Sequence, residues 1–131
     1  MSAVFPVRVY YEDTDFSGNV YHAAYLHFFE RARTEFLRAR GVHHSELLKD
    51  GVAFAVRSMQ IDFLKAAHID DALEVTTRVV GLTPVRLNLI QTIFRDGVEL
   101  TRAEVQLVAI RTQGGVTRFP AQVRAALETG L

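Results

Sequence analysis

The spacing of apolar side chains changes along this chain from a period of two residues to a helical period, and then back again. From Val4 to Tyr11 apolar and polar residues alternate, with Val7, Val9 and Tyr11 on one side, which predicts a β-strand. Pro6 has no backbone N–H to donate, so we expect this strand to lie at an edge of its sheet.

A helix is predicted over His22 to Arg40, where apolar side chains recur every three or four residues. Gly41 follows at a position that favours the left-handed backbone conformation, and Arg38 and Arg40 suit the negative end of the helix dipole. Because its apolar face is rich in large aromatic rings, we expect a core helix and not a surface helix. The residues of this face are Tyr25, Phe28, Phe29, Ala32, Phe36 and Ala39.

The chain after Gly51 is mostly predicted to form strands joined by tight turns. Asp96–Gly97 is a strong signal for a two-residue hairpin, and Gly114–Gly115 indicates another turn. Ser45 to Lys49 predicts one short helical turn, and Pro120 suits the start of a closing helix over Ala121 to Leu127. The strands expected here are Phe54 to Phe63, Ala72 to Val80, Arg86 to Arg95 and Val98 to Thr112.

These elements predict an α+β fold in which one long central helix lies against a curved antiparallel sheet of about five strands. A length of 131 residues fits a single domain, which we place over residues 1–131. One long helix leaves the sheet edges and part of one face uncovered. We therefore expect the chain to form a homo-oligomer.

Composition narrows the range of functions. Lys plus Arg and Asp plus Glu each total 15, so a net charge of zero gives no overall attraction to nucleic acid or anionic membrane. The absence of cysteine excludes disulfides, a thiolate nucleophile and a Cys-ligated zinc site. Met1 to Val7 has no signal-peptide pattern, and no apolar stretch approaches the ~20 residues of a transmembrane helix. We expect a cytoplasmic protein.

The chemistry is concentrated in the polar segment between the first strand and the helix. Glu12, Asp13 and Asp15 come shortly before the predicted helix start at His22. A helix N-terminus has free N–H groups that can hold a developing oxyanion, and a nearby carboxylate can attack a carbonyl or activate water. Gly18 allows the backbone to approach a ligand closely.

Two structural explanations compete with this interpretation. Asp13, Asp15 and Ser17 are residue types that commonly cap helices, and on residue types alone capping is as well supported as catalysis. The pattern Asp13-x-Asp15-x-Ser17-Gly18 also matches the start of a calcium-binding EF-hand loop. That loop needs a glutamate at its twelfth position, where this chain has Ala24, and a helix before it, where this chain has a strand.

His22, His27 and Glu30 on the helix itself are residue types that could form a second metal site. Two histidines five residues apart on a helix diverge by about 140° and cannot share an ion. We therefore expect no metal.

The segment closely resembles the 4-hydroxybenzoyl-CoA thioesterase family, and within it the Tol–Pal-associated, YbgC-type branch of acyl-CoA thioesterases. The likeness is carried by Tyr11 to Leu26, Phe29 to Glu35, Asp62 to Ala67 and Asp70 to Val75. The resemblance implies the hotdog fold, in which an antiparallel sheet wraps a long helix. It also implies a homodimer or a dimer-of-dimers homotetramer with the substrate between subunits. This chain departs from the branch at Phe16–Ser17, where small residues are usual, and at Ala66, where proline is frequent.

The resemblance assigns Asp15 as the catalytic carboxylate, acting as general base or as nucleophile, and His22 as an assisting side chain. It also implies that the backbone N–H of His22 points at the thioester carbonyl. The substrate-binding residues it implies are Tyr11, Gly18, Val20, Tyr21, Ser58 and Lys65. The substrate is expected to be an acyl-CoA or an acyl carrier protein thioester, and no cofactor is expected beyond the CoA of the substrate.

Other details of function stay open at this point. Lys65, Arg57 and Arg86 are candidates for binding the CoA phosphates, each equally well explained as a surface charge. Candidates for the acyl pocket are Phe16, Phe28, Phe54 and Met59. The alternative functions are a hotdog hydratase or dehydratase and a non-catalytic thioester-binding protein.

Overall fold

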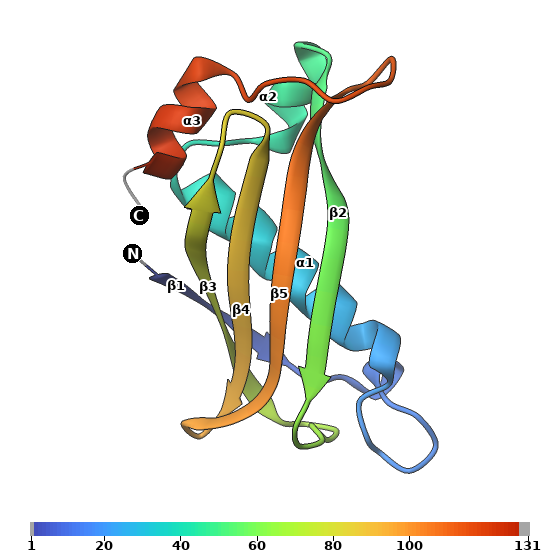
Figure 1. Cartoon of the computed structure of the whole chain (residues 1–131). Helices are drawn as coiled ribbons and strands as arrows, with labels where there is room; N and C mark the ends of the chain where they lie inside the picture. Colours follow the sequence, from blue (N-terminus) through green and yellow to red (C-terminus); the bar gives the residue numbers. More distant parts are fainter. Residues whose placement is uncertain (1, 129–131) are drawn as a thin grey trace.

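A five-stranded antiparallel sheet carries the long helix on one of its faces (Figure 1). The computed structural model describes residues 2–128. The strands lie in the order β1-β3-β4-β5-β2, so β1 and β2 form the two edges. The strands are β1 (Ser2–Arg8), β2 (Val52–Phe63), β3 (Ala72–Leu82), β4 (Arg86–Arg95) and β5 (Val98–Arg111); the helices are α1 (His22–Ala39), α2 (His44–Lys49) and α3 (Ala121–Glu128).

The predicted pairing of the sheet is confirmed, and the edge position of Pro6 in β1 with it. At the β4–β5 hairpin, Asp96 and Gly97 have φ angles of 50° and 78°, as a two-residue turn of this hand requires. The first strand is shorter than predicted, because the chain turns into a 3-10 helix, Tyr11–Asp13, which leaves Tyr11 exposed. The Asp13 carboxylate stabilises this turn by accepting the backbone N–H of Tyr10 at 2.9 Å.

The apolar face of α1 packs against the sheet nearly as predicted. Tyr25, Phe28, Phe29, Ala32 and Phe36 are buried, and so are Ala24, Arg33 and Leu37. Ala39 borders the same hollow as Ala32 and Phe36 but is exposed, so the buried part of this face ends before it. After it the chain turns through Gly41, with φ of 79°, and the Val42 N–H bonds to the Leu37 carbonyl. Val42 is buried and covers this end of the core instead. None of the helices in residues 2–128 is long and apolar enough to cross a bilayer.

A buried polar side chain ties α1 to the middle of the sheet. Gln91 on β4 is fully buried and donates hydrogen bonds to the Phe29 carbonyl of α1 and to Thr77 Oγ1 of β3. Its own carbonyl oxygen accepts a 3.0 Å bond from the buried guanidinium of Arg33. Because every polar atom of this amide has a partner, the network fixes the position of α1 on the sheet.

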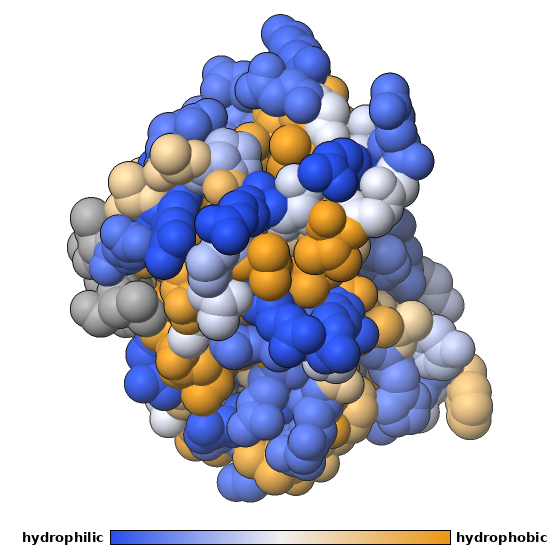
Figure 2. All heavy atoms as spheres, turned by 45° about the horizontal axis from the view of Figure 1, so that its top comes forward, coloured by the Kyte–Doolittle hydropathy of each residue, from blue (hydrophilic) through white to orange (hydrophobic). Residues whose placement is uncertain are grey.

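Within residues 2–128, no helix covers the opposite face of the sheet (Figure 1). A row of hydrogen bonds crosses it, from Arg57 to Gln106 and from Gln106 to Asn88. Figure 2 shows hydrophilic residues interleaved with small apolar patches on this side and at the adjoining end of the molecule. This face also contains a hollow of about 550 Å³, which is lined in part by Ser58, Gln60 and Glu104.

We predict that Gln91→Leu destabilises the protein strongly. The substitution removes the acceptor of the buried Arg33 guanidinium and the amide donor to the Phe29 carbonyl and the Thr77 hydroxyl, which costs about 2–4 kcal/mol. The same change at Gln106, on the open face, should cost less than about 1 kcal/mol because water can replace its partners. Urea unfolding of both variants measures the two costs. Equal costs would show that the Gln91 network does not hold α1 in place.

Candidate active site

The loop between the 3-10 helix and α1 is closed by its own backbone. Thr14 and Val20 form an isolated antiparallel bridge, and the Asp15 N–H bonds to the Asn19 carbonyl at 2.8 Å. Gly18 turns the chain with a φ angle of 82°, a conformation that favours glycine. The loop therefore presents the side chain of Asp15 from a defined backbone position.

The Asp15 carboxylate is held through only one of its two oxygens. Oδ1 accepts hydrogen bonds from the Ser17 N–H at 2.8 Å, the Ser17 hydroxyl at 2.5 Å and the Asn19 N–H at 3.3 Å. Within the described residues, Oδ2 has no hydrogen-bond partner. The Ser17 hydroxyl, followed by the Ser17 N–H, lowers the pKa of Asp15 below its ordinary value of 3.8. Asp15 is thus a carboxylate at neutral pH, with one oxygen available to act.

No side chain of the described part of the chain caps the N-terminus of α1. The N-cap residue is Tyr21, whose side chain makes no capping bond, and the first turn contains no acidic residue. Asp13 instead accepts the Tyr10 N–H, and Asp15 is bonded within its own loop. The hypothesis that these acids cap the helix is therefore wrong. The positive end of α1, beginning at His22, stays available to an anion.

The segment after β2 forms the second wall of the site. It is tied to the Asp15 loop by two backbone bonds, from Val20 N–H to the Ala67 carbonyl and from Ile69 N–H to the Gly18 carbonyl. The His68 and Asn19 side chains add a contact of 2.8 Å. Tyr25 of α1 accepts the Ala67 N–H through its hydroxyl oxygen at 3.0 Å. Both walls of the site are thus held against the start of α1.

A cavity of about 260 Å³ lies between these two walls. It brings together four of the residues that the sequence singled out, namely Asp15, Val20, His22 and Lys65. The Phe63 ring stands edge-on to both His22 and Tyr25, with ring centroids 5.2 and 5.3 Å apart. The cavity is therefore lined by both charged and aromatic side chains.

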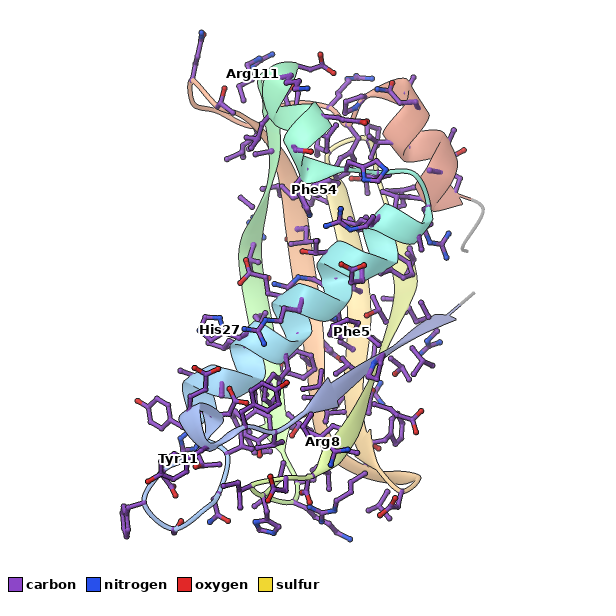
Figure 3. The ribbon with its side chains drawn as sticks, turned by 180° about the vertical axis from the view of Figure 1, so that it is seen from behind. Phe5, Arg8, Tyr11, His27, Phe54 and Arg111 are labelled. Atoms are coloured by element: carbon purple, nitrogen blue, oxygen red, sulfur yellow. The ribbon has the colours of Figure 1, made fainter. Side chains whose placement is uncertain are left out.

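The other predicted substrate-binding residues do not line this cavity. Tyr11 is 81% exposed on the 3-10 helix, and Figure 3 shows it at the loop end of α1. Tyr21 is exposed at the N-cap, and Gly18 contacts the second wall through its carbonyl. Ser58 faces the separate hollow on the open sheet face. Substrate contacts of these four residues stay predictions.

The four aromatic and methionine candidates for the acyl pocket lie elsewhere. Phe28 is in the core, Phe16 is fully exposed, Phe54 lies beside α2 at the other end of α1, and Met59 borders the open-face hollow. The large apolar side chains that line the cavity beside Asp15 are instead Tyr25, Phe63 and Leu64.

The sequence placed Tyr25 on the apolar face of the helix and Phe63 at the end of a strand, because periodicity does not distinguish a core ring from a pocket wall. Two of the three candidate cations for CoA phosphate also lie away from the cavity: Arg57 bonds to Gln106, and Arg86 begins β4 at the far end of the sheet.

Comparison with known proteins agrees with this fold. Residues 9–127 match the model of the thioesterase-like superfamily. The acyl-CoA thioesterase YbgC of Haemophilus influenzae is 44% identical over 93% of this chain and 91% of its own length. The acyl-CoA thioester hydrolase YbgC of Escherichia coli O6:H1 is 43% identical over 80% of this chain and 79% of its own. The crystal structure of a probable thioesterase from Bartonella henselae superposes with a TM-score of 0.87 at 42% identity, covering 92% of this chain and all of that one.

The chain thus belongs to the thioesterase-like superfamily, and its open, curved sheet with one long helix is the hotdog fold of that group.

We predict that Asp15 titrates below 3.8 in the folded protein, since three donors stabilise its charged form. Carboxyl-carbon NMR across the acid range measures this directly, and the urea-unfolded chain supplies the ordinary value. Because the folded-state pKa is lowered, the contribution of Asp15 to stability is present above the unfolded pKa and is lost as the pH falls through the folded one. A folded pKa at or above the unfolded value would contradict the observed hydrogen bonding.

Proposed function

We propose that this chain is an acyl-CoA thioesterase, which hydrolyses an acyl thioester to a free acid and CoA. The observation that carries the proposal is a carboxylate with one unbonded oxygen beside an uncapped helix start, in a cavity with aromatic walls. The relatives named above as acyl-CoA thioesterases support it.

In the mechanism we propose, the thioester carbonyl lies against the first turn of α1. The His22 N–H donates to the carbonyl oxygen as negative charge develops there, and one such donor is worth about 3 kcal/mol. Asp15 Oδ2 removes a proton from the attacking water, or attacks the carbonyl itself to form an anhydride that water then opens. In both routes the C–S bond breaks and CoA leaves as its thiolate.

The two other groups of the cavity have supporting roles in this proposal. The Lys65 ammonium gives the cavity a positive charge that suits the phosphates of CoA. The His22 ring, which is edge-on to Phe63, lies where it can bind the thioester or the leaving thiolate.

Exchange of single carboxylates tests the mechanism. Asp15→Asn keeps the shape of the side chain and removes the base, so kcat for acyl-CoA hydrolysis should fall at least about 100-fold. Asp13→Asn is the matched control, because that carboxylate only accepts the Tyr10 N–H; its kcat should stay within about threefold of the wild type. Release of free thiol from saturated acyl-CoAs is the assay. Wild-type rates for Asp15→Asn would refute the mechanism, and enoyl–hydroxyacyl interconversion without thiol release would favour the hydratase.

We further propose that two copies of the chain pair through β2. This edge strand has 12 residues and hydrogen-bonds to β5 alone in the described chain. Val56 and Phe63 on it are each 47% exposed. A long unprotected edge invites pairing with another strand, and an antiparallel pair of identical strands is compatible with twofold symmetry. The cavity reaches β2 at Phe63, so a partner there would lie beside the substrate.

Charge on the β2 edge tests this assembly. We expect light scattering to give a mass that is a multiple of the 14.7 kDa chain, and Val56→Lys to shift it toward the monomer. Val80→Lys adds the same charge to a residue of similar exposure on β3, away from that edge, and should leave the dimer intact. A monomeric wild type, or a dimer unaffected by Val56→Lys, would contradict pairing through β2.

Three finer expectations rest on the resemblance alone. They are association of two dimers into a homotetramer, a cytoplasmic location with a link to the Tol–Pal system, and use of acyl carrier protein as an alternative acyl carrier.

A further inference from the structure

We infer that Ser17 is a positioning residue: its hydroxyl commits Oδ1 of Asp15 and leaves Oδ2 as the oxygen that reacts. The inference rests on the proposed function of Asp15 and goes beyond it, because the resemblance assigns Ser17 no role.

The geometry of the loop carries this inference. The Ser17 hydroxyl lies 2.5 Å from Asp15 Oδ1, the shortest of the three contacts to that oxygen, and the Ser17 N–H donates to the same atom. Both donors come from one residue, so they define the direction of the carboxylate plane together. The N–H of Asn19, at 3.3 Å, is a weaker third contact.

Ser17 is poorly placed to be a nucleophile itself. It does not line the cavity that contains Asp15, His22 and Lys65, so its hydroxyl is not among the groups that face this cavity.

A residue at position 17 without the hydroxyl would keep the two backbone N–H donors to Asp15 Oδ1, from residues 17 and 19, and would lose the shortest contact to that oxygen. We therefore expect the loop of Ser17→Ala to keep its fold while the carboxylate gains rotational freedom. The other titratable side chains of the cavity that contains Asp15 are His22, Tyr25 and Lys65, and this substitution changes none of them.

Kinetics of Ser17→Ala, with Ser17→Thr as the conservative variant, test the inference. For Ser17→Ala we expect kcat to fall about three- to tenfold with KM within about twofold, because orientation is lost and binding is not. The acid limb of the kcat/KM profile should move to higher pH, since the carboxylate has lost a donor. Ser17→Thr keeps a hydroxyl and should restore both. Thr14→Val is the matched control: it removes a hydroxyl that bonds only to the Tyr11 carbonyl, so its profile should match the wild type.

Two results would overturn the inference. A Ser17→Ala enzyme with unchanged kcat and acid limb would show that the backbone donors alone hold the carboxylate. Loss of activity as complete as in Asp15→Asn would make Ser17 a direct participant in the chemistry. Carboxyl NMR of Asp15 in Ser17→Ala needs no turnover and should show a raised pKa. The hydroxyl is therefore tested even if the wild type hydrolyses no acyl-CoA, an outcome that would refute the proposed function separately.

Discussion

The packing of α1 against the sheet determines where the rest of the molecule can carry chemistry. Its aromatic face fills the core, and the Gln91 network fixes its position on the sheet. A helix held in this way has its N-terminus at one end of the sheet, beside the loop after β2. The chain must reach that point from β1, and the short loop that does so contains Asp15. The position of the candidate site is therefore a consequence of how the core is packed.

The chemistry of the site depends on polar groups that the fold leaves partly unpaired. The Asp13 carboxylate closes a 3-10 turn. The side chain of Tyr21, the N-cap residue of α1, makes no hydrogen bond to the first N–H groups of that helix. The helix start is consequently free, and Asp15 offers an unbonded oxygen close to it. A helix capped by its own aspartate would be stabilised, but it would lose both the free donors and the free acceptor. The arrangement favours binding over local stability at this one helix end.

The sequence predicted the sheet, the long helix and the loop because their signals are local: alternation, helical spacing and the Asp96–Gly97 turn. It did not predict the shorter first strand or the exposure of Ala39. The first follows from the 3-10 turn that the Asp13 carboxylate stabilises, and the second from the turn at Gly41. Residue chemistry left capping and catalysis equally supported for Asp15, because the choice depends on where one oxygen points. The sequence could not predict that Tyr25 and Phe63 line the pocket, because two segments that are distant in the sequence meet there. The family resemblance implied a catalytic role for Asp15, and the structure shows that this residue lines a cavity.

If Asp15 is the catalytic carboxylate, the thioester carbonyl must bind at the start of α1 and not in the larger hollow on the open sheet face. An acyl-CoA analogue with a methylene group in place of the thioester sulfur keeps the carbonyl and cannot be hydrolysed to a thiol. Two-dimensional amide NMR during titration with this analogue shows which N–H groups it meets. The account predicts that the largest change occurs at the His22 amide, with Asn19 and Lys65 close behind. An unchanged His22 signal, together with changes at Ser58 and Gln106, would place the substrate on the other face and contradict it.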